Sequence, residues 1–164
     1  MIKAILACDE VGGVSKDGTL PWPKNSTDLK WFKENTAGHV VVMGSTTWAD
    51  PFMPTPLPKR INIVASSNPS QYTGSGPDAV ISGDLNQEVL NIANKFSGVI
   101  TWVIGGPSVV SQTLDVIDEF YISRIPGEYD CDTHLPLDQI ESLFELTYTE
   151  SHPGVTFEIW KKRK

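Results

Sequence analysis

Short runs of apolar, mostly β-branched residues recur along the chain, and their spacing constrains the fold more than any other feature. Runs of this length and composition are typical of strands that are buried on both faces of a sheet. They cover residues 2–8, 39–43, 61–65, 79–81, 99–104 and 118–125. Segments of helical character lie between several of them, at residues 27–36, 45–50, 85–96 and 107–116. Strands that alternate with helices need crossover connections, so the pattern predicts a mainly parallel sheet with helices on both faces.

The C-terminal part of the chain follows a different pattern. Residues 143–150 and 155–162 alternate apolar and polar side chains around His152-Pro153-Gly154, which is typical of an antiparallel hairpin. The sequence therefore predicts an α/β fold with a mixed, mostly parallel central sheet of about eight strands. A chain of 164 residues is long enough for one ordinary domain, so we expect residues 1–164 to form a single domain.

The charge balance narrows the classes of partner. The chain has 13 Lys and Arg against 20 Asp and Glu, which gives a formal net charge of −7 and no positive field for a nucleic-acid backbone. Residues 96–114 carry no charge over roughly the length of a membrane span. Gly105-Gly106-Pro107 interrupts this stretch, however. We therefore expect neither a nucleic-acid partner nor a membrane partner.

Cysteine usage and the N-terminus both bear on localisation. Cys8 and Cys131 are the only cysteines, and they form no cluster with the spacing of metal ligands, so we expect no metal site. Two thiols without a disulfide framework are typical of a reducing compartment. The apolar N-terminal run is bounded by Lys3 and Asp9, which leaves no room for the core of a signal peptide. These features favour a cytoplasmic protein.

Two long loops are the first candidates for function. Residues 9–24 contain Gly12-Gly13 and Pro21-Trp22-Pro23, and residues 51–58 contain four prolines, which exclude a helix or a central strand. Loops of this length in a compact domain are more often functional than idle.

Asp28 lies at the start of the first predicted helix. With Ser26 or Thr27 as the expected N-cap, a carboxylate in the first turn is explained by the helix dipole alone. A second interpretation comes from its neighbours. Leu29 and Phe32 share a helix face with Asp28, so the carboxylate would lie beside an apolar surface able to hold a flat ring.

Two strand-to-helix turns have similar compositions. Gly105-Gly106-Pro107-Ser108 and Met43-Gly44-Ser45-Thr46-Thr47-Trp48 each follow an apolar run and open a helical segment. Backbone amides in such turns can hold a diphosphate, although a simple tight turn explains either one alone. The GxGxxG fingerprint of dinucleotide-binding folds is absent. Two such turns at one sheet fit a dinucleotide better than one.

Several short segments, taken together and in order, resemble the motifs of the dihydrofolate reductase family. The segments are Leu20-Pro21-Trp22, Thr27-Asp28-Leu29-Lys30-Trp31-Phe32, Val42-Met43-Gly44 with Thr47-Trp48, Pro56-Leu57-Pro58-Lys59-Arg60, Val103-Ile104-Gly105-Gly106, Asp132-Thr133-His134-Leu135-Pro136 and Phe157-Glu158-Ile159-Trp160. Each segment is short, but their order and spacing are specific, and the resemblance spans the whole chain.

The resemblance implies an enzyme that reduces 7,8-dihydrofolate to 5,6,7,8-tetrahydrofolate with NADPH, by hydride transfer to C6 and protonation at N5. Such an enzyme supplies one-carbon metabolism and thymidylate synthesis. The resemblance also implies inhibition by 2,4-diaminopyrimidine or pteridine antifolates and a monomeric state. Tolerance of NADH in place of NADPH stays open.

The resemblance further implies roles for individual residues. Asp28 would grip the pterin with support from the Ser123 hydroxyl, and Trp22 and Leu20 would belong to a lid loop over the nicotinamide. The residues implied to line the substrate site are Ile5, Ala7, Asp28, Leu29, Phe32, Leu57, Ile104 and Ser123, with Arg60 binding the glutamate carboxylate. Those implied to line the cofactor site are Ala7, Val14, Ser15, Gly18, Thr19, Gly44, Ser45, Thr46, Thr47, Ser66, Ser67, Gly105, Gly106, Pro107, Ser108 and Val109.

The sequence departs from the family pattern at several of these positions. Ser15 replaces a glycine of the lid loop, and Val110 replaces an aromatic residue at the nicotinamide rim. Ser45 stands where an arginine usually contacts the 2′-phosphate of the cofactor, and Ser108 stands at another commonly basic position. Extra residues in the 48–58 loop place Phe52 and Met53 only loosely near the substrate. The reaction type is therefore better defined than the cofactor preference.

Two other readings stay open on the sequence. One is the related pyrimidine reductase of riboflavin synthesis, which shares the fold and the nicotinamide site, although Asp28 after Pro21-Trp22 argues against it. The other is a non-catalytic folate- or nucleotide-binding domain in which Ser15 and Val110 have impaired the nicotinamide site. Oxidation of NADPH that depends on dihydrofolate separates all three.

Overall fold

A computed structural model of the chain describes residues 1–50, 55–72 and 76–164. Its strands are β1 (Ile2–Cys8), β2 (Gly13–Ser15), β3 (Val40–Gly44), β4 (Ile61–Ala65), β5 (Ala79–Ile81), β6 (Thr101–Gly105), β7 (Glu119–Arg124), β8 (Thr133–His134), β9 (Phe144–His152) and β10 (Val155–Lys162). Its helices are α1 (Ser26–Thr36), α2 (Ser45–Ala49), α3 (Leu85–Lys95), α4 (Pro107–Thr113) and α5 (Leu137–Leu143), with 3-10 turns η1 (Pro69–Tyr72) and η2 (Leu114–Val116).

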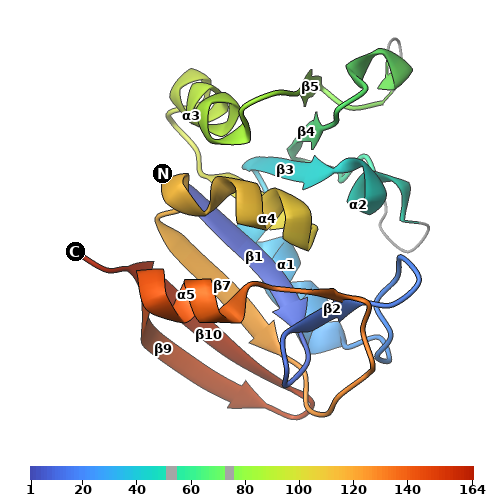
Figure 1. The fold of residues 1–164 in the computed structure, drawn as a ribbon, viewed down its shortest axis with the longest axis vertical. Helices are drawn as coiled ribbons and strands as arrows, with labels where there is room; N and C mark the ends of the chain where they lie inside the picture. The colour runs from blue at the N-terminus through green and yellow to red at the C-terminus, as the bar shows by residue number, and fades with distance from the viewer. Residues whose placement is uncertain (51–54, 73–75) are drawn as a thin grey trace.

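Eight strands form one mixed sheet in the order β5-β4-β3-β6-β1-β7-β10-β9 (Figure 1). The pairs from β5 to β7 are parallel, whereas β10 is antiparallel to both β7 and β9. The predicted α/β fold, the mostly parallel sheet and the C-terminal hairpin are confirmed. A separate two-stranded sheet pairs β2 with β8, and the sequence patterns did not predict it.

The helix starts show how local sequence sets the elements. Asn25 caps α1, because its side chain accepts a hydrogen bond from the backbone N–H of Asp28 at 3.1 Å. The expectation that Ser26 or Thr27 would be the cap is wrong, since both lie inside the helix. Asp84 caps α3 in the same way. The predicted helix at 107–116 ends as an α-helix at Thr113 and continues as η2.

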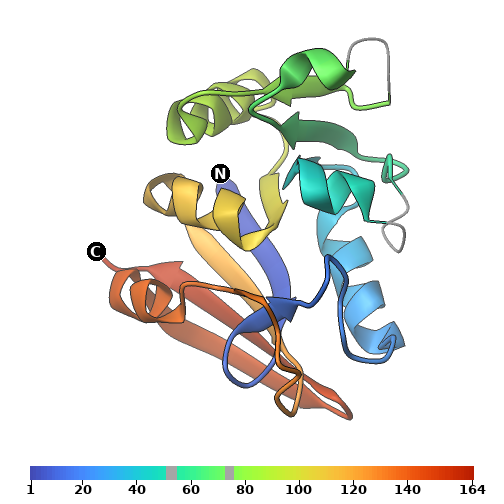
Figure 2. The same ribbon diagram turned by 45° about the vertical axis from the view of Figure 1, so that its right-hand side comes forward.

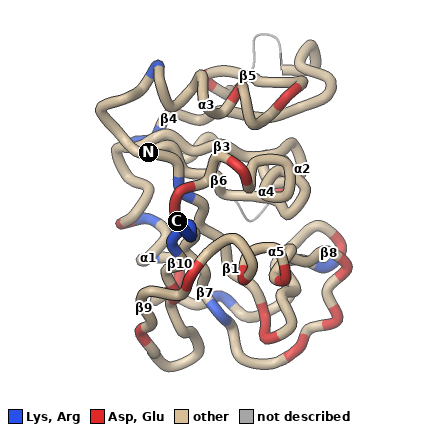
Figure 3. The backbone as a smooth tube through the Cα atoms, turned by 60° about the vertical axis from the view of Figure 1, so that its left-hand side comes forward, with Lys and Arg blue, Asp and Glu red and all other residues tan. Residues whose placement is uncertain are grey.

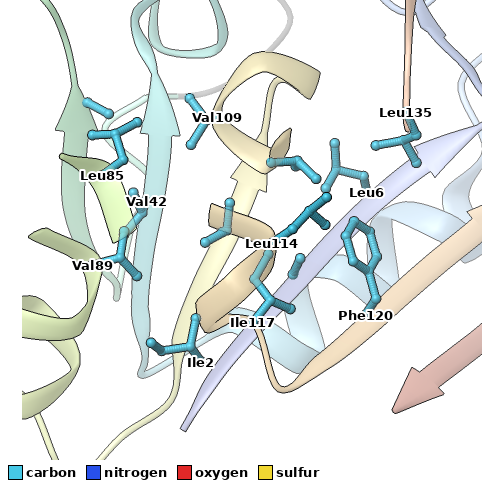
Figure 4. Close-up of a cluster of buried hydrophobic side chains, with 14 of the residues drawn as sticks. Ile2, Leu6, Val42, Leu85, Val89, Val109, Leu114, Ile117, Phe120 and Leu135 are labelled. Carbon is cyan, nitrogen blue, oxygen red and sulfur yellow. The ribbon is translucent and has the colours of Figure 1, made fainter. Parts of the chain in front are cut away.

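Helices cover both faces of the sheet. On one face, apolar side chains of α3, α4 and α5 pack on the sheet in a large buried cluster that includes Val42, Val89, Val109 and Phe120 (Figure 4). The other face carries α1, whose Trp31 and Phe32 pack against buried residues of β1, β3 and β6. Within the described residues, no helix is long and apolar enough to cross a membrane.

The parallel strands end together along one edge of the sheet, where α2 and α4 begin. Ligands of open α/β sheets bind outside this carboxyl edge. The loop that follows β1 also starts here and runs past β2 to the beginning of α1 (Figure 2). The functional site is therefore expected between this edge, the loop and α1.

Candidate active site

Asp28 is half-buried in the first turn of α1, and its carboxylate accepts a hydrogen bond from the Ser123 hydroxyl. Ser123 lies on β7 and is 1% exposed. Burial raises the pKa of Asp28 above its usual value, and the hydrogen bond from Ser123 only partly offsets this effect. No ion pair engages Asp28 among the described residues. The carboxylate is thus free to pair with a charged or polar ligand.

Strand register explains why this pair lies at the site. In the parallel pair of β1 and β7, Ala7 is opposite Ser123 and Ile5 is opposite Tyr121. Side chains two apart on a strand share a face, so Ile5 and Ala7 face the same side as Ser123, toward α1. The C-terminal end of β1 therefore lies beside Asp28.

An apolar wall continues from Asp28 across the sheet. Ile5, Leu57 and Ile104 are buried in one cluster, and Phe32 of α1 packs against it. Four of the residues expected to line the substrate site are thus brought together. Leu29 is 46% exposed and lies outside the clusters, so its expected contact stays a prediction. Phe52 and Met53 lie outside the described residues.

Arg60 stands at the far end of this wall. Its guanidinium carbon is 5.7 Å from the ring centroid of Phe32, and its Nε is buried without a hydrogen-bond partner. Burial lowers the pKa of Arg60. Asn62 fixes the preceding segment, because its side chain pairs with both backbone groups of Leu57, at 2.8 and 3.0 Å, and donates to the Arg60 carbonyl at 3.1 Å.

Sequence reasoning did not single out Asn62. It is 1% exposed in the middle of an apolar strand. An asparagine in such a run needs a partner, because an unpaired buried amide costs free energy. A polar amide within an apolar strand was therefore the sequence signal by which Asn62 could have been found.

The loop before α1 carries Trp22, which packs beside the site. Trp22 is 7% exposed and meets the Tyr129 ring edge-on at 5.8 Å between centroids. It belongs to a cluster with Phe157, against which Ala7 packs. Leu20 is 50% exposed on the same loop. The structure therefore brings Trp22 and Ala7 together, whereas Leu20 lies on the surface.

The same loop is tied to the segment around β8. Ser15 and Thr133 share a hydrogen bond of 2.5 Å between their hydroxyls. The backbone N–H of Asp17 donates to the Asp132 carboxylate at 2.9 Å, and the Asp132 N–H donates to the Ser15 carbonyl at 3.0 Å. Ser15, which departs from the family pattern, thus has its own partner here. Figure 1 shows β2 beside the orange segment that leads to α5.

Three other expected cofactor residues of this region differ in exposure. Val14 is 8% exposed and packs in the large cluster with the core of the opposite face. Gly18 lies at an exposed turn with φ +82°, and Thr19 accepts a hydrogen bond from the Lys16 N–H at 2.9 Å. Val110 is 0% exposed in the same cluster as Val14.

The two glycine turns lie side by side, because β3 and β6 are neighbours and Met43 pairs with Gly105. Gly105 has φ +128°, a conformation that favours glycine. A Cβ at Gly105 would lie 3.5 Å from Thr47 Oγ1, and one at Gly44 would lie 3.0 Å from Val109 Cγ2. Backbone amides, a hydroxyl and little side-chain bulk therefore meet where α2 and α4 begin. This set of donors fits a diphosphate.

The other residues expected at the cofactor site carry neutral hydroxyls. Ser66 accepts from the Asn68 N–H at 3.0 Å, and Ser108 Oγ accepts from the Gln112 side chain at 3.1 Å. Neither α2 nor α4 has a Lys or Arg, and the tube is tan along both helices in Figure 3. Ser45, Thr46 and Ser67 complete the hydroxyl set. The described residues contain no His/Cys/Asp/Glu group that could hold a metal ion.

Comparison with known proteins gives the family. The sequence profile of dihydrofolate reductase matches residues 1–158. The chain belongs to the dihydrofolate reductase family. The dihydrofolate reductase of Bacillus subtilis (strain 168) is 34% identical over 151 residues, which cover 92% of this chain and 83% of that protein. The dihydrofolate reductase of Haemophilus influenzae is 35% identical over 123 residues, which cover 75% and 71%.

A solved structure agrees with the sequence comparison. The dihydrofolate reductase from Enterococcus faecalis, complexed with NADP(H) and RAB-propyl, superposes with a TM-score of 0.86 at 31% identity, covering 100% of this chain and 97% of that chain. The chain is therefore an oxidoreductase with dihydrofolate reductase activity. Of the three interpretations that the sequence left open, the dihydrofolate reductase interpretation is confirmed.

Proposed function

We propose that Asp28 is the group that binds and orients the pterin ring of dihydrofolate. The observation that carries this proposal is a half-buried carboxylate with one neutral partner, Ser123, beside an apolar wall. An ionised carboxylate can accept two N–H bonds side by side. The N3–H and the 2-amino group of a pterin present such a pair of donors.

This grip also serves the chemistry. A carboxylate bound to the amino side of the ring raises its electron density toward N5, which must take a proton as C6 takes a hydride. Among the residues proposed to line the substrate site, Asp28 is the only acid. We infer that water delivers the proton to N5, with Asp28 and Ser123 holding the ring in place.

The remaining substrate contacts follow from the wall. Ile5, Phe32, Leu57 and Ile104 would enclose the flat ring and the adjoining aryl group, with Leu29 at the exposed side. Arg60 would pair with the α-carboxylate of the glutamate tail, because its guanidinium presents a planar fork of donors. Pairing there would also satisfy the Nε that is buried without a partner.

NADPH is the cofactor that fits the two glycine turns. Gly44 to Thr47 and Gly105 to Val109 would hold the diphosphate, and Ser66 and Ser67 would lie on the adenosine side. Ala7, Val14, Ser15, Gly18 and Thr19 would border the nicotinamide. When bound, NADPH supplies the hydride. The 2′-phosphate would meet the neutral hydroxyls of Ser45 and Ser67, so we expect a smaller preference for NADPH over NADH than an arginine at position 45 would give.

The loop that carries Leu20 and Trp22 would close over the nicotinamide and exclude bulk water, as lid loops do in many enzymes. Trp22 is already packed against Tyr129 and the cluster around Ala7. Leu20 is exposed and could move toward the ligand on closure.

The wider setting is proposed from the same resemblance. The chain would act as a single domain over residues 1–164 and as a cytoplasmic monomer. Its product would supply one-carbon metabolism and thymidylate synthesis. Pteridine and 2,4-diaminopyrimidine antifolates would compete with dihydrofolate at Asp28, because their protonated ring presents the same pair of donors.

Inhibitor binding tests this arrangement. The affinity of a 2,4-diaminopyrimidine is measured for the wild type and for Asp28→Asn by titration in the presence of NADPH. We expect the variant to bind at least tenfold more weakly, because charge-assisted hydrogen bonds are about twice as strong as neutral ones. Equal affinity would show that Asp28 does not hold the ring. As a control for substrate dependence, NADPH oxidation should stop when dihydrofolate is omitted.

A further inference from the structure

Asp9, the residue directly after β1, has an unusual environment for a carboxylate. It is 0% exposed. Its Oδ1 accepts the backbone N–H groups of Val11 at 3.0 Å and Gly13 at 2.8 Å. Its Oδ2 accepts the N–H of Tyr129 at 3.0 Å and the thiol of Cys131 at 3.7 Å. Four donors from two separate segments thus converge on one side chain.

All four donors are neutral, and no cation pairs with Asp9 among the described residues. Burial by itself would raise the pKa of Asp9, but the N–H groups of Tyr129, Gly13 and Val11 lower it below its usual value. The side chain is therefore a carboxylate at neutral pH. An ionised carboxylate only accepts hydrogen bonds, which matches four donors. In an asparagine of the same shape, the side-chain NH2 group would point toward one of these N–H or S–H donors.

The donors belong to two segments, the start of the lid loop and the segment before β8. Val11 and Gly13 begin the loop that carries Trp22, and Tyr129 packs on the Trp22 ring. The loop backbone closes on the same residue, because the Asp9 N–H donates to the Gly13 carbonyl at 2.8 Å. Asp9 therefore holds the start of the lid loop and the segment before β8 in one fixed relation to the end of β1.

Gly13 shows how closely these segments pack. A Cβ at Gly13 would lie 2.7 Å from Asp9 Oδ2 and 2.7 Å from both Cβ and Sγ of Cys131. Real Cβ atoms do not approach other atoms so closely. Glycine is needed here for space, since the Asp9 carboxylate and the Cys131 side chain fill the position that a side chain would take.

We propose that Asp9 is a positioning residue for hydride transfer, which acts by fixing the lid loop relative to Ala7 and Trp22. Asp9 does not touch the substrate, and this role rests on the lid function proposed above. A small displacement of a lid slows the chemical step, because errors of about 1 Å can cost about 100-fold in rate. The substrate wall of Ile5, Phe32, Leu57 and Ile104 makes none of the hydrogen bonds to Asp9, so it should stay in place.

The first test compares Asp9→Asn with the wild type by single-turnover hydride transfer and by steady-state kinetics. We expect the hydride-transfer rate to fall at least tenfold while the KM for dihydrofolate changes less than about twofold. Val89→Ala is the matched control, because it removes buried atoms of α3 on the opposite face. It should lower the melting temperature and leave hydride transfer at the wild-type rate.

A second variant keeps the test decisive if Asp9→Asn does not fold. Gly13→Ala leaves Asp9 in place but drives a methyl group between Asp9 and Cys131, and it should produce the same split between rate and KM. Wild-type hydride transfer in a folded Asp9 or Gly13 variant would overturn the proposal. So would a slowing of Val89→Ala that matches its loss of stability. If Asp28→Asn were fully active, the proposed substrate site would fail instead, independently of the result for Asp9.

Discussion

The Ser123 hydroxyl donates a hydrogen bond to the Asp28 carboxylate, and this contact joins β7 to the first turn of α1. Ser123 is 1% exposed and faces the same side of the sheet as Ala7. A hydroxyl can donate only one hydrogen bond, so most acceptor sites of the carboxylate stay open for a ligand. The pair thus fixes the carboxylate without using up its binding capacity.

Asp28 should cost the folded protein stability at neutral pH. Because burial raises its pKa in the folded state, the folded protein holds this proton more tightly than the unfolded chain does. Stability therefore falls as the pH rises through the interval between the unfolded and folded pKa values, and the cost is complete above the folded value. We expect Asp28→Asn to melt at a higher temperature than the wild type at pH 7. The difference should shrink as the pH falls toward 4. Melting curves of both proteins across this range check it, and a constant difference would contradict it.

Arg60→Leu should weaken binding far more than it slows the reaction. The glutamate carboxylate is remote from C6, so its contact with Arg60 contributes similarly to the ground state and the transition state. We expect the KM for dihydrofolate to rise about tenfold or more, as for the loss of a charged hydrogen bond, with kcat within about twofold. A pterin without the glutamate tail serves as the control and should be nearly indifferent to the change. If the KM rose equally for both substrates, Arg60 would have only a structural role.

Ser45→Arg should increase the preference for NADPH. A charged hydrogen bond contributes about 1.5–3 kcal/mol, so an arginine facing the 2′-phosphate should lower the KM for NADPH about tenfold. The KM for NADH should stay nearly unchanged. The gain should fade at high salt, since ions screen exposed charges. Steady-state kinetics of both proteins with both cofactors decide it. An equal effect on NADH would show that position 45 does not face the 2′-phosphate.

Strands and helices with strong patterns were predictable from the sequence. Apolar runs such as 61–65 gave β4 without error, because a strand buried on both faces has a continuous apolar signature. Helix α5 and the β2–β8 pair were missed. The strand pair was missed because β8 has two residues and β2 has three, so their pairing depends on tertiary contacts such as the one between Ser15 and Thr133.

The candidate site was predictable where its residues fall within short motifs that recur in a fixed order. Asp28, Phe32 and Leu57 could be chosen from motif order, and the structure brings their elements together. Asp9 and Asn62 could not, because their roles depend on donors supplied by distant segments. The N-cap of α1 was also misassigned, since Asn25, Ser26 and Thr27 are all good caps and only the backbone geometry selects Asn25.

Dihydrofolate-dependent NADPH oxidation by Asp28→Asn, measured as a function of pH, tests the proposed role of Asp28 most directly. At pH 7 we expect the folded variant to lose at least about 100-fold in kcat/KM, since the amide keeps the shape but loses the charged pair with the pterin. The defect should shrink at low pH, where N5 of the substrate is already protonated. Turnover near the wild-type rate at neutral pH would contradict the assignment of Asp28 as the group that holds the substrate ring.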